Sequence, residues 1–130
     1  MTTARLDVAV HSYLASHAGL NSLISGSLHR TMAPANYPRP YCVLFRVSRV
    51  RGYTHDGYSG LTRYRLQVSC FADTDELAKQ VAEQVTAAME AWPSVNLNVQ
   101  SCEHVGEQDL YEADAKVYHV PVDFLIVYPV

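Results

Sequence analysis

The sequence lacks the features that mark membrane, secreted and phosphate-binding proteins. Its longest apolar runs, such as residues 124–128, are far shorter than the roughly 18 residues that a membrane helix needs, so we expect no membrane partner. Residues 1–7 contain no basic stretch followed by an apolar block, and we therefore expect no secretion signal. Repeats and low-complexity tracts are absent, and Gly52, Gly57 and Gly60 are wrongly spaced for a phosphate-binding loop.

Cysteine is also scarce. The three cysteines, Cys42, Cys70 and Cys102, are odd in number and show no C-x-x-C spacing. This pattern predicts free thiols in a reducing cytosol rather than a disulfide framework. A zinc site needs clustered ligands at characteristic spacing. We therefore expect no metal and no other cofactor.

No group of residues in the sequence indicates an enzyme. The nearest approach to a catalytic pair is His55-Asp56, but adjacent residues in a flexible loop rarely hold the geometry of a base and its orienting carboxylate. Glu103-His104 meets the same objection. No serine lies in a nucleophile elbow, and no cysteine has an obvious activating partner. We predict no catalytic residues, and keep a small ligand-binding or enzymatic domain as an alternative because a sequence does not reveal a pocket.

The composition that remains is that of one globular domain. The chain has 130 residues, of which 48% are hydrophobic and 18% are charged. A domain of this size buries roughly two thirds of the surface that its unfolded chain exposes. We predict a single domain over residues 1–130.

Apolar residues recur at helical spacing in two segments. The first predicts a helix over residues 6–17 that ends at Gly19, followed by a short turn over 20–24 and a brief strand over 28–32. The second predicts an amphipathic helix that Asp73 or Thr74 caps and Pro93 ends. Asp75 and Glu76 suit the positive end of that helix.

Elsewhere the pattern alternates with period two, which is typical of strands. We expect a strand from Tyr41, a long mobile loop over residues 52–60 with an Asp56-Gly57 turn, and a return strand over 61–72. Further strands are expected over 95–102 and 118–128, with an acidic connector over 106–115, and Pro121 indicates that part of the last strand lies at a sheet edge. The predicted fold is α+β: an antiparallel β-sheet with a long central hairpin, packed by an N-terminal helix and a second amphipathic helix on one face.

The formal net charge of −3 conceals an asymmetry along the chain. Residues 1–71 carry eight Lys and Arg residues against two acids, and residues 72–130 carry two against eleven. Such a split favours head-to-tail contact between copies or contact with a charged partner. The alternative is that strands and helices merely differ in their solvent-facing charges.

The arginines of the predicted hairpin are the main candidates for a binding surface. Arg49, Arg51, Arg63 and Arg65 occupy odd positions, so a matching register would join them in one basic patch beside two tyrosines. Arginine and tyrosine are enriched at the centres of interfaces. A solvated sheet face is the plain alternative, and nucleic-acid binding is a rival that the acidic composition and the absence of an RNA-binding aromatic motif disfavour. The predicted interface residues are Arg46, Arg49, Arg51, Tyr53, Asp56, Tyr58, Arg63 and Arg65.

A series of short motifs runs along nearly the whole chain. After the opening helix come Leu23-Ile24-Ser25-Gly26, Leu28-His29-Arg30, Met32-Ala33-Pro34, Pro40-Tyr41-Cys42-Val43-Leu44-Phe45, Asp56-Gly57-Tyr58-Ser59-Gly60-Leu61, Arg63-Tyr64-Arg65-Leu66-Gln67-Val68, Ala72-Asp73, and a helix with Ala78, Val81, Ala82 and Val85. Their order and spacing resemble the tail-completion, or tail-terminator, proteins of long-tailed bacteriophages. The acidic segment over residues 107–114 departs from that pattern.

This resemblance implies a structural role in the virion. Members of that family are thought to form a ring, usually of six copies, on the head-proximal end of the tail tube. The ring stops tube polymerisation and offers a surface to the head connector. The implied partners are other copies of the chain, the tail tube protein and a head connector or head-completion protein, with DNA passing through the lumen without sequence-specific binding. Assembly would take place in the host cytoplasm, and a head-closure ring is the alternative.

Overall fold

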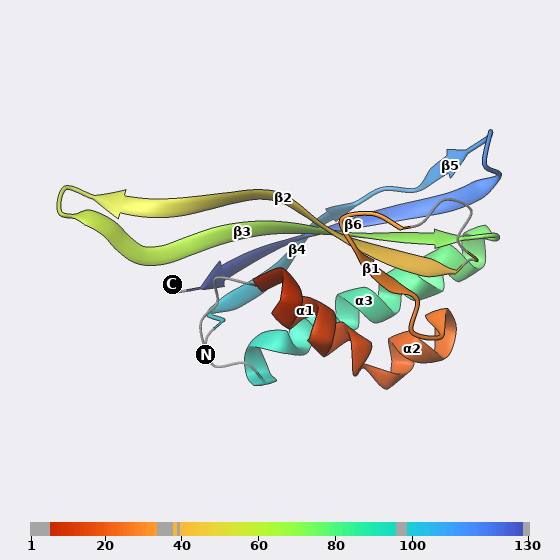
Figure 1. The fold of residues 1–130 in the computed structure, drawn as a ribbon, viewed down its shortest axis with the longest axis horizontal. Coiled ribbons are helices and arrows are strands. Elements are labelled where there is room, and N and C mark those ends of the chain that lie inside the picture. The colour runs from red at the N-terminus through yellow and green to blue at the C-terminus, as the bar shows by residue number, and fades with distance from the viewer. Residues whose placement is uncertain (1–5, 34–37, 39, 96–98, 129–130) are drawn as a thin grey trace.

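The computed structural model describes residues 6–33, 38, 40–95 and 99–128. Within these residues, helices cover one side of a β-sheet (Figure 1). The predicted α+β fold is therefore confirmed. The elements in chain order are α1 (Leu6–Ala15), α2 (Ala18–Ile24), β1 (Leu28–Arg30), β2 (Tyr41–Thr54), β3 (Gly57–Ala72), α3 (Asp75–Val95), β4 (Ser101–Glu107), β5 (Leu110–Glu112) and β6 (Val117–Tyr128).

The described strands form one six-stranded sheet in the order β1-β2-β3-β6-β4, with β5 also paired to β6. The pairings are antiparallel except that β1 runs parallel to β2, with Leu28 opposite Cys42. The sheet is thus mixed at this one edge. The strand predicted over residues 28–32 is present as β1, but periodicity carries no information about the direction in which a strand pairs.

The core lies between the helices and the lower face of the sheet in Figure 1. Every second residue of β6 from Val120 to Tyr128 is buried, as the alternation predicts. On α3 the buried residues include Met89 and Trp92, and Trp92 stacks on Tyr13 of α1. The Tyr13 hydroxyl donates to the carbonyl of Ala88 at 2.7 Å, which ties α1 to α3.

The N-terminal helical region differs from its prediction at Gly19. Helix α1 ends at Ala15, and Gly19 lies inside α2 rather than at a helix end. The Nδ1 atom of His17 caps α2 by accepting from the N–H of Leu20 at 3.2 Å. A Cβ atom on Gly19 would collide with the side-chain amide of Gln84 on α3. A larger residue at this position would require the Gln84 side chain to move. Gly19 lies within α2, so the prediction that it ends the first helix is wrong.

Helix α3 begins as predicted and ends later than predicted. Thr74 is the cap, since its Oγ1 atom accepts from the N–H of Leu77 at 3.2 Å. The helix runs to Val95, so Pro93 does not end it. Proline has no N–H, so the last turn lacks one i→i−4 hydrogen bond, and the helix ends two residues after Pro93.

The C-terminal strands also require correction. Val95 belongs to α3 and β4 starts at Ser101, so the strand predicted over residues 95–102 is displaced; Leu97 lies outside the described residues, as does Pro34 of the Met32-Ala33-Pro34 motif. The expected connector over 106–115 contains β5.

The prediction that Pro121 marks a sheet edge is wrong, because β6 lies inside the sheet. The Pro121 carbonyl accepts from the N–H of Gln108, which lies between β4 and β5. The backbone nitrogen and carbonyl of a strand residue point to the same side of the strand. The nitrogen of Pro121, which carries no hydrogen, therefore faces the segment between β4 and β5, where no hydrogen bond between paired strands is lost.

Among the described residues no helix is both long enough and apolar enough to cross a membrane. All three cysteines are buried free thiols. Cys42 and Cys70 lie opposite each other in the hairpin with their Sγ atoms 3.8 Å apart.

Candidate assembly interface

The central hairpin is longer and more regular than the sequence indicated. Its strands continue to Thr54 and resume at Gly57, so the predicted loop over residues 52–60 is wrong. His55 and Asp56 alone form the turn, and the Asp56 N–H donates to the Thr54 Oγ1 atom at 3.3 Å. Gly57 has a φ of 111°, which favours glycine. The Asp56-Gly57 signal therefore locates the turn, and the hairpin projects well beyond the helices (Figure 1).

A β-bulge in β2 decides which side chains share a face. Arg46 lies opposite Leu66, but Ser48 lies opposite Arg65, so Val47 is an extra residue in β2. An inserted residue exchanges the two faces for every position that follows it. A second register shift lies between Arg51 and the turn.

The bulge places the hairpin arginines on two faces. Arg49 lies opposite Tyr64, a core residue with 4% exposure, and opposite residues of an antiparallel pair project to the same side. Arg51 shares that side, whereas Arg63 and Arg65 flank Tyr64 on β3 and project to the other. The expected single patch is therefore wrong, although all four side chains are exposed.

The remaining predicted interface residues divide between the tip and the body of the hairpin. Tyr53 lies opposite Tyr58 next to the turn and is 66% exposed. Asp56 is exposed in the turn itself, whereas the side chain of Tyr58 is outside the described part. Arg46 is exposed and lies nearer the body. The structure thus brings Tyr53, Asp56 and the backbone of Tyr58 together and leaves Arg46 apart from them.

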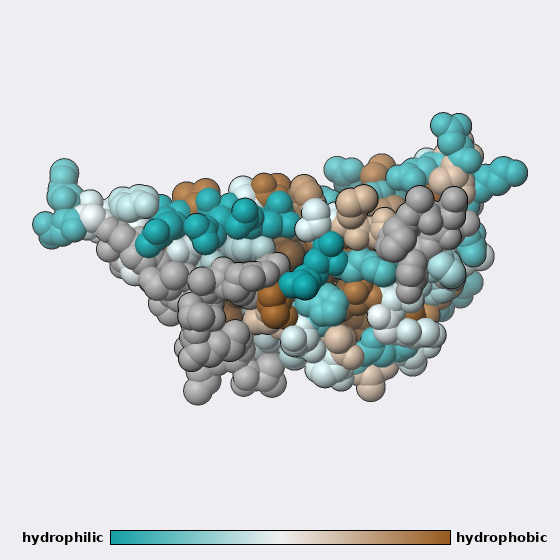
Figure 2. Space-filling model, in the orientation of Figure 1, coloured by the Kyte–Doolittle hydropathy of each residue, from teal (hydrophilic) through white to brown (hydrophobic). Residues whose placement is uncertain are grey.

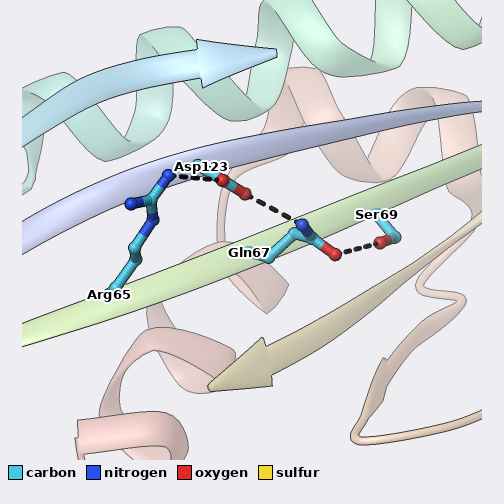
Figure 3. Close-up of polar contacts among 4 residues, drawn as sticks. All are labelled: Arg65, Gln67, Ser69 and Asp123. Atoms are coloured by element: carbon cyan, nitrogen blue, oxygen red, sulfur yellow. Dashed lines mark hydrogen bonds and ion pairs between the residues drawn. The ribbon is translucent and has the colours of Figure 1, made fainter. Parts of the chain in front are cut away.

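Arg65 belongs to a polar network on the uncovered face of the sheet (Figure 3). Its guanidinium donates to Asp123 on β6 at 3.0 Å, and the Gln67 amide donates to the other carboxylate oxygen at 3.0 Å. The Ser69 hydroxyl donates to the Gln67 carbonyl at 3.3 Å. The charge of Arg65 is thus balanced within the chain by Asp123.

The opposite end of the molecule is acidic. Strand β3 runs from the hairpin turn to Ala72, where α3 begins and where β5 and β6 turn back, so these segments lie at the far end of the long axis (Figure 1). Lys79 of α3 lies 3.1 Å from Asp75 and 3.7 Å from Asp109, which confirms that α3 begins beside β5. The exposed acids at this end are Asp73, Asp75, Glu76, Asp109, Glu112 and Asp114. Six of the eleven acids of residues 72–130 thus lie at the end of the fold opposite the hairpin turn.

The two His-carboxylate pairs of the sequence lie in the hairpin turn and on β4. His55 and Asp56 are both exposed in the hairpin turn. Glu103 and His104 are successive strand residues that project to opposite faces, and the His104 Nε2 atom instead lies 3.0 Å from Glu107. The residues that the structure describes contain no cluster of His, Cys, Asp or Glu that could hold a metal.

Sequence reasoning missed a row of aromatic rings on the uncovered face. Tyr41 stacks on Phe71 with ring centroids 4.9 Å apart, and Phe71 stacks on His119 at 4.2 Å. Burial lowers the pKa of His119 because it disfavours the imidazolium, and the carboxylate of Glu112 acts in the opposite direction. A groove of about 370 Å³ lies beside this row, with Met32 among its lining residues. The sequence shows the alternation within each strand but not the pairing between strands. The register, which sets Tyr41 opposite Phe71 and Phe71 opposite His119, is what aligns the rings.

Comparison with known proteins relates the chain to one family and to solved structures. The model of the family described as tail completion protein gp17 matches residues 8–129 of the chain. A chain from a solved structure described as the virion of a native gene transfer agent particle has a similar fold, with a TM-score of 0.80 and 15% sequence identity. That match covers 96% of this chain and 95% of the other. No curated protein matches the chain.

Proposed function

Because the chain belongs to the family of tail completion protein gp17, we propose that it forms a ring on the head-proximal end of the tail tube. The ring ends tube polymerisation and provides the surface to which the head attaches. The family places the chain among the structural proteins of the phage tail, and we assign it no enzymatic activity.

The separation of charge between the two ends of the fold carries this proposal. A ring of identical subunits uses a head-to-tail interface, so each subunit needs two different and complementary surfaces. The hairpin presents Arg49, Arg51 and Arg63, and the far end presents the acids at the start of α3 and around β5. Opposite potentials on two surfaces favour a contact between unlike surfaces and disfavour a contact between like ones.

The hairpin is the element best placed to meet a neighbour. It projects beyond the helices, and its tip carries the exposed Tyr53 (Figure 1). Figure 2 shows apolar atoms interspersed among hydrophilic ones along the projecting strand β2. An element with few tertiary contacts gains order when another surface packs against it. We propose that Arg46, Arg49, Arg51, Tyr53, Asp56, Tyr58, Arg63 and Arg65 line contacts with a neighbouring copy or with the tube.

The partners follow from this position. One side of the ring contacts the last tail tube subunits, and the other receives a head connector or head-completion protein. DNA passes through the lumen without being read, because phosphate contacts carry no sequence information. Six copies match the number usual in the family that the sequence resembles.

A capping assay tests the proposed function. Purified chain is added to preformed tail tubes, and tube subunits labelled with a fluorophore are then supplied. A terminator blocks further growth at one tube end, and electron microscopy shows a ring at that end. Growth at both ends at the rate seen without the chain would contradict the proposal. The same assay without tubes reports whether the free chain is already a ring.

A further inference from the structure

The exposed apolar side chains are concentrated on the two edges of the sheet. Nine large hydrophobic residues of the described chain are exposed, and seven of them lie on β2 or on β4 and β5. Scattered exposed apolar residues are normal on a protein surface, but a contiguous set marks an interaction site. The seven are Phe45, Val47, Val50 and Tyr53 on β2 and Val105, Leu110 and Tyr111 on β4 and β5.

Among the described strands, β2 pairs only with β3 from Phe45 onward, so it is an edge strand of the sheet there. β1 covers only residues 42–44, and the last bond on that side within the described chain runs from the Thr31 N–H to the Leu44 carbonyl at 2.7 Å. From Phe45 to Thr54 the residues are exposed, apart from the half-buried Gly52. An edge strand that exposes apolar side chains is a template for pairing with another strand.

Strands β4 and β5 form the other edge. Among the described strands each of them pairs only with β6, so their outer sides are open. Residues 101–112 contain four acids and no lysine or arginine, whereas residues 45–54 contain three arginines and no acid. The two edges therefore match each other in apolar content and have opposite charge.

We propose that the β2 edge of one copy pairs with the β4–β5 edge of the next copy, so that the sheets join around the assembly. This inference rests on the proposed ring and assigns the strands that form its interface. Two β2 edges would bring arginines together and two β4–β5 edges would bring acids together, so charge disfavours both symmetric pairings. The remaining heterologous pairing is the kind that generates a ring when its rotation closes.

The bulges limit where the strands pair. Register shifts lie on either side of residues 48–51 of β2, and that segment is the regular stretch between them. Bulges interrupt an edge and are a common protection against uncontrolled strand addition. The backbone pairing between copies is thus confined to a short segment in which Arg49 and Arg51 are the charged residues, and the exposed apolar residues Phe45, Val47 and Tyr53 flank it.

Charge exchange between the two edges tests this pairing. The basic-edge variant carries Arg49→Glu and Arg51→Glu, the acidic-edge variant carries Glu103→Arg and Glu112→Arg, and a third variant combines all four changes. Each is supplied in place of the wild-type chain during particle assembly. The number of chains per tail is measured by quantitative mass spectrometry. We expect each two-residue variant to lower that number about tenfold through like-charge repulsion, and the combined variant to restore it.

A matched control uses the exposed face of α3. Glu83→Arg reverses a charge on the side of α3 that lies beside α2, away from both edges. Combined with the basic-edge variant, it should not restore assembly, and thermal unfolding of every purified variant checks that it folds. Two outcomes would overturn the edge pairing and leave the proposed function standing, provided that the wild-type chain is present on tails. The first is normal assembly of either the basic-edge or the acidic-edge variant. The second is failure of the combined variant to restore assembly. Absence of the wild-type chain from tails would overturn the proposed function as well.

Discussion

Arg65 of β3 and Asp123 of β6 form an ion pair in which the guanidinium and the carboxylate lie 3.0 Å apart. Asp123 also accepts from Gln67, so one carboxylate holds two donors on the uncovered face of the sheet. Arg65 therefore contributes to the fold, whereas Arg49 on the other face is available for an interface. Arg49 and Arg65 both occupy odd positions of the hairpin, and they project to opposite faces of the sheet because of one inserted residue in β2.

Substitutions at this pair should lower the stability of the fold more than a substitution at Arg49 does. Asp123→Ala should lower the free energy of unfolding by about 1 kcal/mol because two donors lose their acceptor, and Arg65→Ala should lower it by about half as much because the pair is partly exposed. Arg49→Ala should leave it within about 0.5 kcal/mol of the wild-type value. Urea unfolding measures all three, and equal losses for Arg49→Ala and Asp123→Ala would refute the assignment.

The cap of α3 gives a second prediction with a control on the same helix. Thr74→Ala removes the acceptor of the Leu77 N–H and should cost about 1 kcal/mol of stability. Thr86→Ala removes a hydroxyl that bonds to the Ala82 carbonyl within the helix, where that carbonyl already has a backbone partner. The second change should be close to neutral in thermal unfolding. A larger loss for Thr86→Ala than for Thr74→Ala would contradict the capping role.

Close packing of α2 on α3 gives a third prediction. Gly19→Ala should fail to stabilise the wild-type chain, because the new methyl group meets the Gln84 side chain. With Gln84→Ala in the background, the same change should raise stability by about 0.5 to 1 kcal/mol, the usual gain when alanine replaces glycine in a helix. A double-mutant cycle by chemical denaturation measures the coupling. Identical effects in both backgrounds would show that the two residues do not interact.

His119 predicts a dependence of stability on pH. Burial lowers its pKa in the folded chain below the ordinary value near 6.5, so the unfolded chain binds this proton first as pH falls. Stability from this group is therefore present above pH 6.5 and is lost as pH decreases toward the folded pKa. His119→Phe should reduce the loss of stability between pH 7 and pH 5, as measured by urea unfolding at both values. An unchanged loss would mean that other groups dominate in this range.

The cysteines give a fifth prediction. Burial raises the pKa of Cys102 to about 12, with the nearby carboxylates of Glu90 and Glu103 adding to the effect, and the pKa of Cys70 is also raised, chiefly by its hydrogen bond with Cys42. Thiolates are the reactive form, so a thiol reagent at pH 8 should modify the native chain slowly. Modification should accelerate together with global unfolding in urea. Rapid labelling of the native chain would show that at least one of these thiols is accessible.

Much of the fold is visible in the sequence because local rules and tertiary packing agree. The threonine cap of α3, the inward alternation of β6 and the Asp56-Gly57 turn are all local patterns that the structure keeps. The predictions for Gly19 and Pro93 were wrong because glycine and proline often mark the end of a helix, whereas here each residue lies within a helix. Local preference is a weak guide wherever two elements meet closely.

The candidate interface was harder to predict because it depends on register. Val43, Phe45 and Val47 alternate as if they shared one face, and nothing in that alternation reveals the extra residue at Val47. A single bulge exchanges the faces beyond it, so positions of equal parity on β2 and β3 no longer face the same side. The charge split between the two halves needed no register to be seen in the sequence, and its role in an interface stays a prediction.

The proposed role is tested most directly by electron microscopy of particles assembled after deletion of the gene for this chain. A terminator predicts tail tubes that exceed the normal length and carry no heads, with filled heads lying free beside them. Tails of normal length that remain unjoined would contradict termination and leave only a joining role. Intact virions with joined heads and tails of normal length would contradict the proposed function altogether.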